Sequence, residues 1–426
     1  MASLTTENRI AVAEVSDDLH HEASVHLDFL GHHPEEHHAD EVCHAIEEGD
    51  FQYKPRLFHG MEEDPVKEPK SFVFQHIVKK TKEFVKTREA LSNLHSRHNT
   101  YAEKIMVHPD IPYMAIDDGL DKHKLDVWVP IGAGTSLKDL PIVVHFHGGG
   151  WIRGDRKDEF RGAPAACRQY ASNGIVAVAP SYRLRNPGHM EDAVAAVEWV
   201  LKHASLFGAN SKALFISGHS AGGNIVGNLA VGTWLDSVLL KYNASVIGAI
   251  CISGVYSLLN PLGGIGAGIK NRVFNAVYRK NVFGDDLVIL ARHSPCAQIR
   301  MLLGEEAYPK SECKVCKLAH KVVDWLSANG DKSDAVVKTR RLSLADGPLL
   351  KHVLKLRSTG FMILNAEDDM GLRTDGKKFV DLLSKAGIKD VTYSILPGRT
   401  HASIALDDAS LESASEFVLK MFQNRK

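Results

Sequence analysis

The chain has 426 residues, of which 44% are hydrophobic and 24% charged, which is enough for one large α/β domain with an additional segment. Its formal net charge of −1 gives no electrostatic indication of binding to nucleic acid or an anionic membrane, and no stretch reaches the roughly 20 apolar residues of a membrane-spanning helix. The first residues lack the basic and apolar runs of a leader segment, so we expect a cytoplasmic protein that binds no nucleic acid.

Residues 1–100 differ in composition from the rest of the chain. Between His20 and His44, eight histidines are mixed with Asp and Glu. Such a cluster can hold a transition metal, but a solvated acidic arm is the favoured interpretation. Apolar residues recur at helical spacing from Ser71 to Leu94, which predicts an amphipathic helical extension that packs on the main domain or serves a partner.

The next part of the chain alternates strands with helices. Residues 113–116 and 124–129 predict a β-hairpin, and continuous apolar runs predict buried strands at 141–146 and 175–180. Helical patterns cover 163–173 and 190–203. This alternation predicts an α/β fold, with a mostly parallel sheet flanked by helices on both sides.

A glycine-rich turn, His147-Gly148-Gly149-Gly150-Trp151, follows the strand at 141–146. Consecutive glycines after a buried strand allow main-chain N–H groups to point at one place, which is what an oxyanion hole requires. The motif therefore predicts that the N–H of Gly149 or Gly150 binds a developing oxyanion.

The stretch Ser217-Gly218-His219-Ser220-Ala221-Gly222-Gly223 has the spacing of a nucleophile elbow, with an apolar strand before it and a helical pattern after it. Small neighbours let the flanking backbones pass at the sharp turn. We expect Ser220 at the carboxyl edge of the sheet as the nucleophile, with the N–H of Ala221 completing the oxyanion hole.

The pattern loses its alternation between residues 255 and 359, where we place a helical cap or lid inserted between the core segments 101–254 and 360–426. Strands are expected at 246–254, 360–366 and 391–396, with helices at 374–386 and 410–422. Within the insertion, the basic and partly apolar segment 270–280 is interpreted as a lid helix rather than as a lipid-binding or partner-binding surface. Membrane association is therefore not favoured.

An acidic residue and a histidine follow the last two predicted strands. The order Ser220, acid, His401 is that of the α/β-hydrolase triad, and each residue lies just past the carboxyl end of a strand. His401 would take the proton of Ser220, and the acid would hold the imidazole tautomer. Asp369 is the preferred acid, with Asp368 as the alternative.

Six cysteines are scattered along the chain, which is not the density of a disulfide scaffold. Cys313-x-x-Cys316 with His320 resembles half of a zinc site, but no second pair follows, so the start of a polar helix is favoured. We expect neither a metal nor a cofactor.

The glycine turn at 147–151 together with the elbow at 218–223 resembles the esterase/lipase group of the α/β-hydrolase superfamily. This group includes hormone-sensitive-lipase-like carboxylesterases, kynurenine formamidases and isoprenylcysteine methylesterase-like enzymes. Trp151 after the glycines and the motif Gly398-x-x-His401 are similar to the formamidase and methylesterase side, and Ala366-Glu367-x-Asp369 is similar to its acid strand. The His-rich arm and residues 301–356 depart from the pattern, and the resemblance covers about residues 105 to 424.

The resemblance implies a serine hydrolase that cleaves small carboxylic esters or aryl formamides through an acyl-enzyme, with Trp151 near the substrate. The alternative hypothesis is a ligand-binding receptor that keeps the fold without turnover. Such receptors commonly lack a triad residue, whereas Ser220, Asp369 and His401 are all present here.

Overall fold

The computed structural model describes residues 105–115, 121–131, 138–259, 261–264, 266–305, 307 and 356–425. All of them belong to the compact unit Lys70–Lys426. The His-rich arm, the extension at 71–94 and the segment containing Cys313, Cys316 and His320 lie outside the described residues. The proposed division into arm, core and cap therefore stays a prediction.

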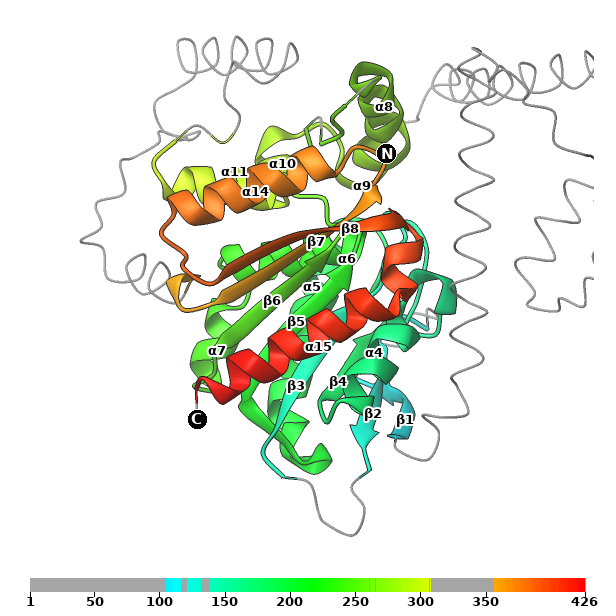
Figure 1. The fold of residues 1–426 in the computed structure, drawn as a ribbon, viewed down its shortest axis with the longest axis vertical. Coiled ribbons are helices and arrows are strands. Elements are labelled where there is room, and N and C mark those ends of the chain that lie inside the picture. Colours follow the sequence, from blue (N-terminus) through cyan, green and yellow to red (C-terminus); the bar gives the residue numbers. More distant parts are fainter. Residues whose placement is uncertain are drawn as a thin grey trace, which may run out of the picture. The chain divides into compact units, whose positions relative to one another are not determined.

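The core of the fold is an eight-stranded sheet in the order β1-β2-β4-β3-β5-β6-β7-β8 (Figure 1). The pairs β1–β2 and β2–β4 are antiparallel, and all pairs from β4 through β8 are parallel. This confirms the predicted mostly parallel α/β fold. The strands are β1 (Ile105–Pro112), β2 (Lys124–Pro130), β3 (Leu140–Phe146), β4 (Val176–Pro180), β5 (Ala209–His219), β6 (Val246–Ile252), β7 (Gly360–Asp368) and β8 (Val391–Thr400).

The first strand lies elsewhere than predicted. The sequence pattern favoured 113–116, but β1 runs from Ile105 to Pro112 and pairs with β2. It is a half-exposed edge strand with a register shift between His108 and Ile111, and it contains two prolines, Pro109 and Pro112. An edge strand tolerates proline and does not need alternating apolar residues, so the period-two pattern was absent.

Helices cover both faces of the sheet. On one face, α4 (Ala163–Ser172) and α15 (Asp408–Gln423) pack over an apolar cluster that includes Phe215 and Ile250. They cross the near side of the sheet in Figure 1. The other face is covered by α5 (Gly188–His203), α6 (Ala221–Val231), α7 (Asp236–Lys241) and α14 (Arg373–Lys385). Short 3-10 helices are η1 (Glu159–Arg161), η2 (Ala204–Phe207) and η4 (Ser403–Leu406).

A helical segment lies between β6 and β7, where the cap was expected. It contains α8 (Ala267–Phe274), the π-helix η3 (Asn275–Arg279), α9 (Lys280–Phe283), α10 (Leu287–Arg292) and α11 (Pro295–Leu302). The helix expected at 270–280 is confirmed, because α8, η3 and α9 follow one another without a break. Across the described residues, no helix is long and apolar enough to cross a membrane.

Candidate active site

Ser220 occupies the tight turn between β5 and α6. Its backbone has φ 55° and ψ −114°, a conformation that costs free energy for a residue with a side chain. A Cβ on Gly222 would lie 2.0 Å from the carbonyl oxygen of Phe146, and one on Gly218 would lie 2.5 Å from Gly222. The prediction that small neighbours are required at this elbow is therefore confirmed.

His401 directly follows β8, and its side chain contacts Ser220 at the elbow. Its Nε2 lies 2.9 Å from the Ser220 Oγ. Two main-chain contacts fix its position: its N–H donates to the carbonyl of Asp368 over 3.1 Å, and the Nε2 of His219 donates to its carbonyl over 2.8 Å. Both main-chain polar groups of His401 are thus hydrogen-bonded, which fixes the backbone that carries the imidazole toward the serine hydroxyl.

Asp369 completes the chain of hydrogen bonds. Its Oδ1 lies 2.6 Å from the Nδ1 of His401, and its Oδ2 accepts from the Ser253 hydroxyl at 2.7 Å and the Asn365 amide at 2.6 Å. Burial alone would raise the pKa of Asp369. The interaction with His401, together with the hydrogen bonds from Asn365 and Ser253, outweighs burial and holds the pKa below its ordinary value.

The two candidate acids have different contacts. The Asp369 carboxylate faces His401 and is 2% exposed, whereas Asp368 ends β7 and offers its main-chain carbonyl to the His401 N–H. An ionised buried carboxylate against Nδ1 selects the tautomer that leaves Nε2 free to accept the serine proton. This geometry favours Asp369 over Asp368 as the acid.

The glycine-rich turn lies beside Ser220. A Cβ on Gly148 would be 3.5 Å from the Cβ of Ser220, so the backbone of this turn passes close to the serine. Gly149 and Gly150 have φ of 118° and 63°, which favour glycine. Ala221, the first residue of α6, directly follows Ser220 and is fully buried. Ala221 is therefore adjacent to Ser220, and Gly149 and Gly150 follow Gly148 in the turn that passes beside it.

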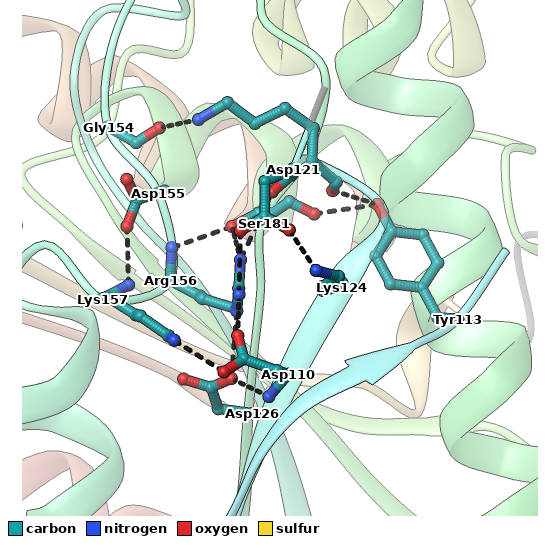
Figure 2. Close-up of polar contacts among 11 residues, drawn as sticks. Asp110, Tyr113, Asp121, Lys124, Asp126, Gly154, Asp155, Arg156, Lys157 and Ser181 are labelled. Atoms are coloured by element: carbon teal, nitrogen blue, oxygen red, sulfur yellow. Dashed lines mark hydrogen bonds and ion pairs between the residues drawn. The ribbon is translucent and has the colours of Figure 1, made fainter. Parts of the chain in front are cut away.

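A buried arginine holds the far end of the same turn (Figure 2). Arg156 is 1% exposed and donates from Nε to Asp126 over 3.0 Å and from Nη1 to the Ser181 hydroxyl over 3.2 Å. Its Nη2 contacts the carboxylates of Asp110 and Asp121. The loop that contains Gly149 and Gly150 is thereby joined to β1, β2 and the end of β4.

Trp151 is 1% exposed and packs edge-on against Phe283 of α9, with ring centroids 5.1 Å apart. Its indole N–H has no hydrogen-bond partner within the described part of the chain. The surrounding apolar cluster joins the elbow to the helical segment after β6; its buried members are Trp151, Ala221, Val255, Leu258, Leu262, Phe274, Val282, Phe283, Leu290 and Leu372. Apolar side chains thus adjoin Ala221, the residue after Ser220.

The structure adds residues that sequence reasoning did not assign. Ser253 and Asn365 hold Asp369, and His219 holds the His401 main chain. Tyr278 of η3 packs on Gly150, where a Cβ would lie 2.4 Å from its ring. Ser253 was detectable, because it follows a parallel strand at the same edge as Ser220 and Asp369. Tyr278 was not, because nothing in the local pattern links η3 to the glycine turn.

Metal binding is not indicated by the described residues. In the ranges that the structure covers, no group of three or more His, Cys, Asp or Glu side chains is arranged to hold an ion. The predicted Cys313 and His-rich candidates lie outside those ranges.

Comparison with known proteins gives matches to hydrolases. Residues 143–260 match a family model described as alpha/beta hydrolase fold. The chain is 38% identical over 97 residues to the esterase LipI of Mycobacterium tuberculosis, covering 22% of this chain and 29% of that protein. It is 30% identical over 153 residues to a kynurenine formamidase of Danio rerio, covering 35% and 46%. The chain thus spans less than half the length of these curated relatives.

Solved structures extend the similarity over most of the chain. Esterase B from Lactobacillus rhamnosis superposes with a TM-score of 0.51 at 14% identity, covering 82% of this chain and 98% of that one. At this identity the likeness concerns the fold. The fold found here is thus the α/β-hydrolase fold.

Proposed function

We propose that this chain, which belongs to the α/β-hydrolase superfamily and resembles its esterase/lipase group, hydrolyses carboxylic esters or aryl formamides through an acyl-enzyme on Ser220. One observation carries the proposal. Ser220 Oγ, His401 Nε2, His401 Nδ1 and Asp369 Oδ1 form one continuous chain, with contacts of 2.9 Å and 2.6 Å.

In the first half-reaction, Ser220 Oγ attacks the substrate carbonyl carbon while its proton passes to the Nε2 of His401. The carbonyl oxygen becomes an oxyanion, for which the N–H groups of Ala221 and of Gly149 or Gly150 are the proposed donors. Asp369, ionised and buried, stabilises the imidazolium that forms. Collapse of the tetrahedral intermediate then breaks the bond to the alcohol or amine, which leaves with the proton from His401.

In the second half-reaction, water replaces the leaving group. His401 takes a proton from water as the oxygen attacks the acyl carbon, and it returns that proton to Ser220 Oγ when the acid departs. No redox step or cofactor is required for this sequence. The apolar cluster next to Ala221, which includes Trp151, favours an apolar group on at least one side of the cleaved bond.

The test uses a fluorophosphonate probe, which forms a phosphorus–oxygen bond only with an activated serine and releases fluoride. We expect intact-mass spectrometry to find one adduct on the wild type, mapped to Ser220, and none on Ser220→Ala. Ser205→Ala serves as the matched control, since Ser205 is exposed and lies outside the site. An unlabelled wild type, or equal labelling of Ser220→Ala, would contradict the proposal and favour the receptor alternative.

Substrate class is separated by parallel assays with p-nitrophenyl acetate and N-formylkynurenine. Relatives of both kinds match this chain: the esterase LipI and the kynurenine formamidase. Ester turnover that depends on Ser220, without formamide turnover, identifies a carboxylesterase; the reverse identifies a formamidase. Failure with both substrates, despite labelling of Ser220, would direct the search to larger acyl groups.

A further inference from the structure

The continuous helix formed by α8, η3 and α9 presents an apolar stripe to solvent. Ile269, Val273 and Val277 follow one another at intervals of four and are 58%, 55% and 40% exposed. This spacing places their side chains on one face. Large aliphatic side chains that are exposed together, rather than singly, indicate a binding surface.

The same face is basic. Arg272 and Lys280 are exposed beside the stripe, and Lys270 is half-buried at its start. No Asp or Glu occurs in the sequence from Ser253 through Gly284. The first acid after it, Asp285, pairs over 2.6 Å with Arg279, which is buried on the inner side of the helix. The exposed cations are therefore not neutralised from within this helix.

The inner face of the helix lies at the candidate active site. Phe274 is buried in the apolar cluster with Trp151 and Ala221, and the Tyr278 ring packs on Gly150. Figure 1 shows α8 beyond the carboxyl ends of the strands, at the end of the molecule where the site lies. A partner bound to the outer stripe would consequently sit on a helix whose inner face contacts the glycine turn and the apolar cluster.

We propose that the outer face of α8, η3 and α9 docks on an anionic lipid surface. The apolar stripe would enter the boundary between headgroups and acyl chains, and Arg272, Lys280 and Lys270 would lie against lipid phosphates. Charge complementarity selects this occupant: an apolar protein partner or a second copy of the same basic face would leave the cations unmatched. This docking is independent of the proposed hydrolysis, although it would present membrane-dissolved esters to the site.

The test is co-sedimentation of the full chain with vesicles. One set contains equal parts of phosphatidylcholine and phosphatidylglycerol, and the other contains phosphatidylcholine alone. We expect the wild type to pellet with the first set and to stay in the supernatant with the second. Binding should weaken as salt rises, because the screening length falls from about 10 Å at 0.1 M to about 3 Å at 1 M.

Two variants test the surface itself. Arg272→Glu with Lys280→Glu reverses the charge, and Ile269→Asp with Val273→Asp removes the apolar stripe; each is expected to lose most of the pelleted fraction. The matched control changes an exposed cation and an exposed leucine elsewhere, Lys202→Glu with Leu206→Asp, and should pellet like the wild type. Thermal unfolding midpoints check that each variant is folded, so the test does not depend on activity.

Three outcomes would overturn the proposal. The first is failure of the wild type to pellet with anionic vesicles. The second is pelleting of both helix variants like the wild type, which would assign binding to another part of the chain. The third is a dimer in light scattering that Val273→Asp dissociates, without vesicle binding, which would make a second copy the occupant. The first and third results leave the proposed hydrolysis untouched, since fluorophosphonate labelling of Ser220 measures it separately.

Discussion

Replacing Arg156 by methionine tests how the loop with the proposed oxyanion donors is held. The side chain is 1% exposed and contacts three carboxylates, of which Asp126 is itself buried at 4% exposure. Methionine keeps much of the volume but removes the guanidinium, so Asp126 loses its buried counter-charge. Without the guanidinium, Asp126 keeps the hydrogen bond that it accepts from the main-chain N–H of Asp110 over 2.7 Å.

The expected magnitude follows from burial. Removing one partner of a buried ion pair costs about 3–5 kcal/mol, because the remaining charge is left uncompensated. Lys157 provides the contrast: it pairs with Asp110 over 2.7 Å, but both side chains are exposed. Exposed pairs contribute about 0–1 kcal/mol. Arg156→Met should therefore lower the free energy of unfolding several times more than Lys157→Met does.

Urea unfolding followed by circular dichroism measures both variants, and the double variant Arg156→Met with Asp126→Asn checks the cause. Removing the orphaned charge should recover part of the lost stability, because the two changes affect one interaction. Equal losses for Arg156→Met and Lys157→Met, or no recovery in the double variant, would refute the reasoning. Ester or formamide turnover of the folded fraction of Arg156→Met should also fall, since the loop with Gly149 and Gly150 loses its anchor.

Other predictions concern single contacts. Ser253→Ala removes a hydrogen bond to the Asp369 carboxylate, so the free energy of unfolding in urea at neutral pH should fall by about 1.5–3 kcal/mol; an unchanged value would contradict that bond. Burial raises the pKa of Asp375 to about 6, although hydrogen bonds from Ser257 and Tyr256 act to lower it. The contribution of this carboxyl group to stability should therefore be greatest below pH 4 and should be lost as pH rises through 6. The difference between this pKa and the ordinary value of 3.8 corresponds to about 3 kcal/mol, and Asp375→Asn should flatten that part of the urea-derived pH profile. Gly222→Ala would place a Cβ 2.0 Å from a backbone oxygen, so we expect loss of soluble folded protein, and a normal thermal midpoint would contradict it.

Much of the fold was predictable from local patterns. Runs of apolar residues such as 141–146 and 175–180 correspond to β3 and β4, because strands buried on both faces must be continuously apolar. The elbow around Ser220 was predictable because only small residues permit its turn. The edge strand β1 was placed wrongly, because exposure on an edge removes the constraint that creates a pattern.

The amino-acid sequence by itself determined the class of fold, the position of Ser220 at a strand-to-helix turn and the order of serine, acid and histidine, since these depend on local periodicity and on backbone sterics. Only the tertiary structure decided that Asp369 rather than Asp368 faces His401, that Arg156 holds the glycine turn, and that Tyr278 packs on Gly150. Those contacts join residues far apart in the chain. They depend on the angle at which strand ends and helices converge, which no local spacing records.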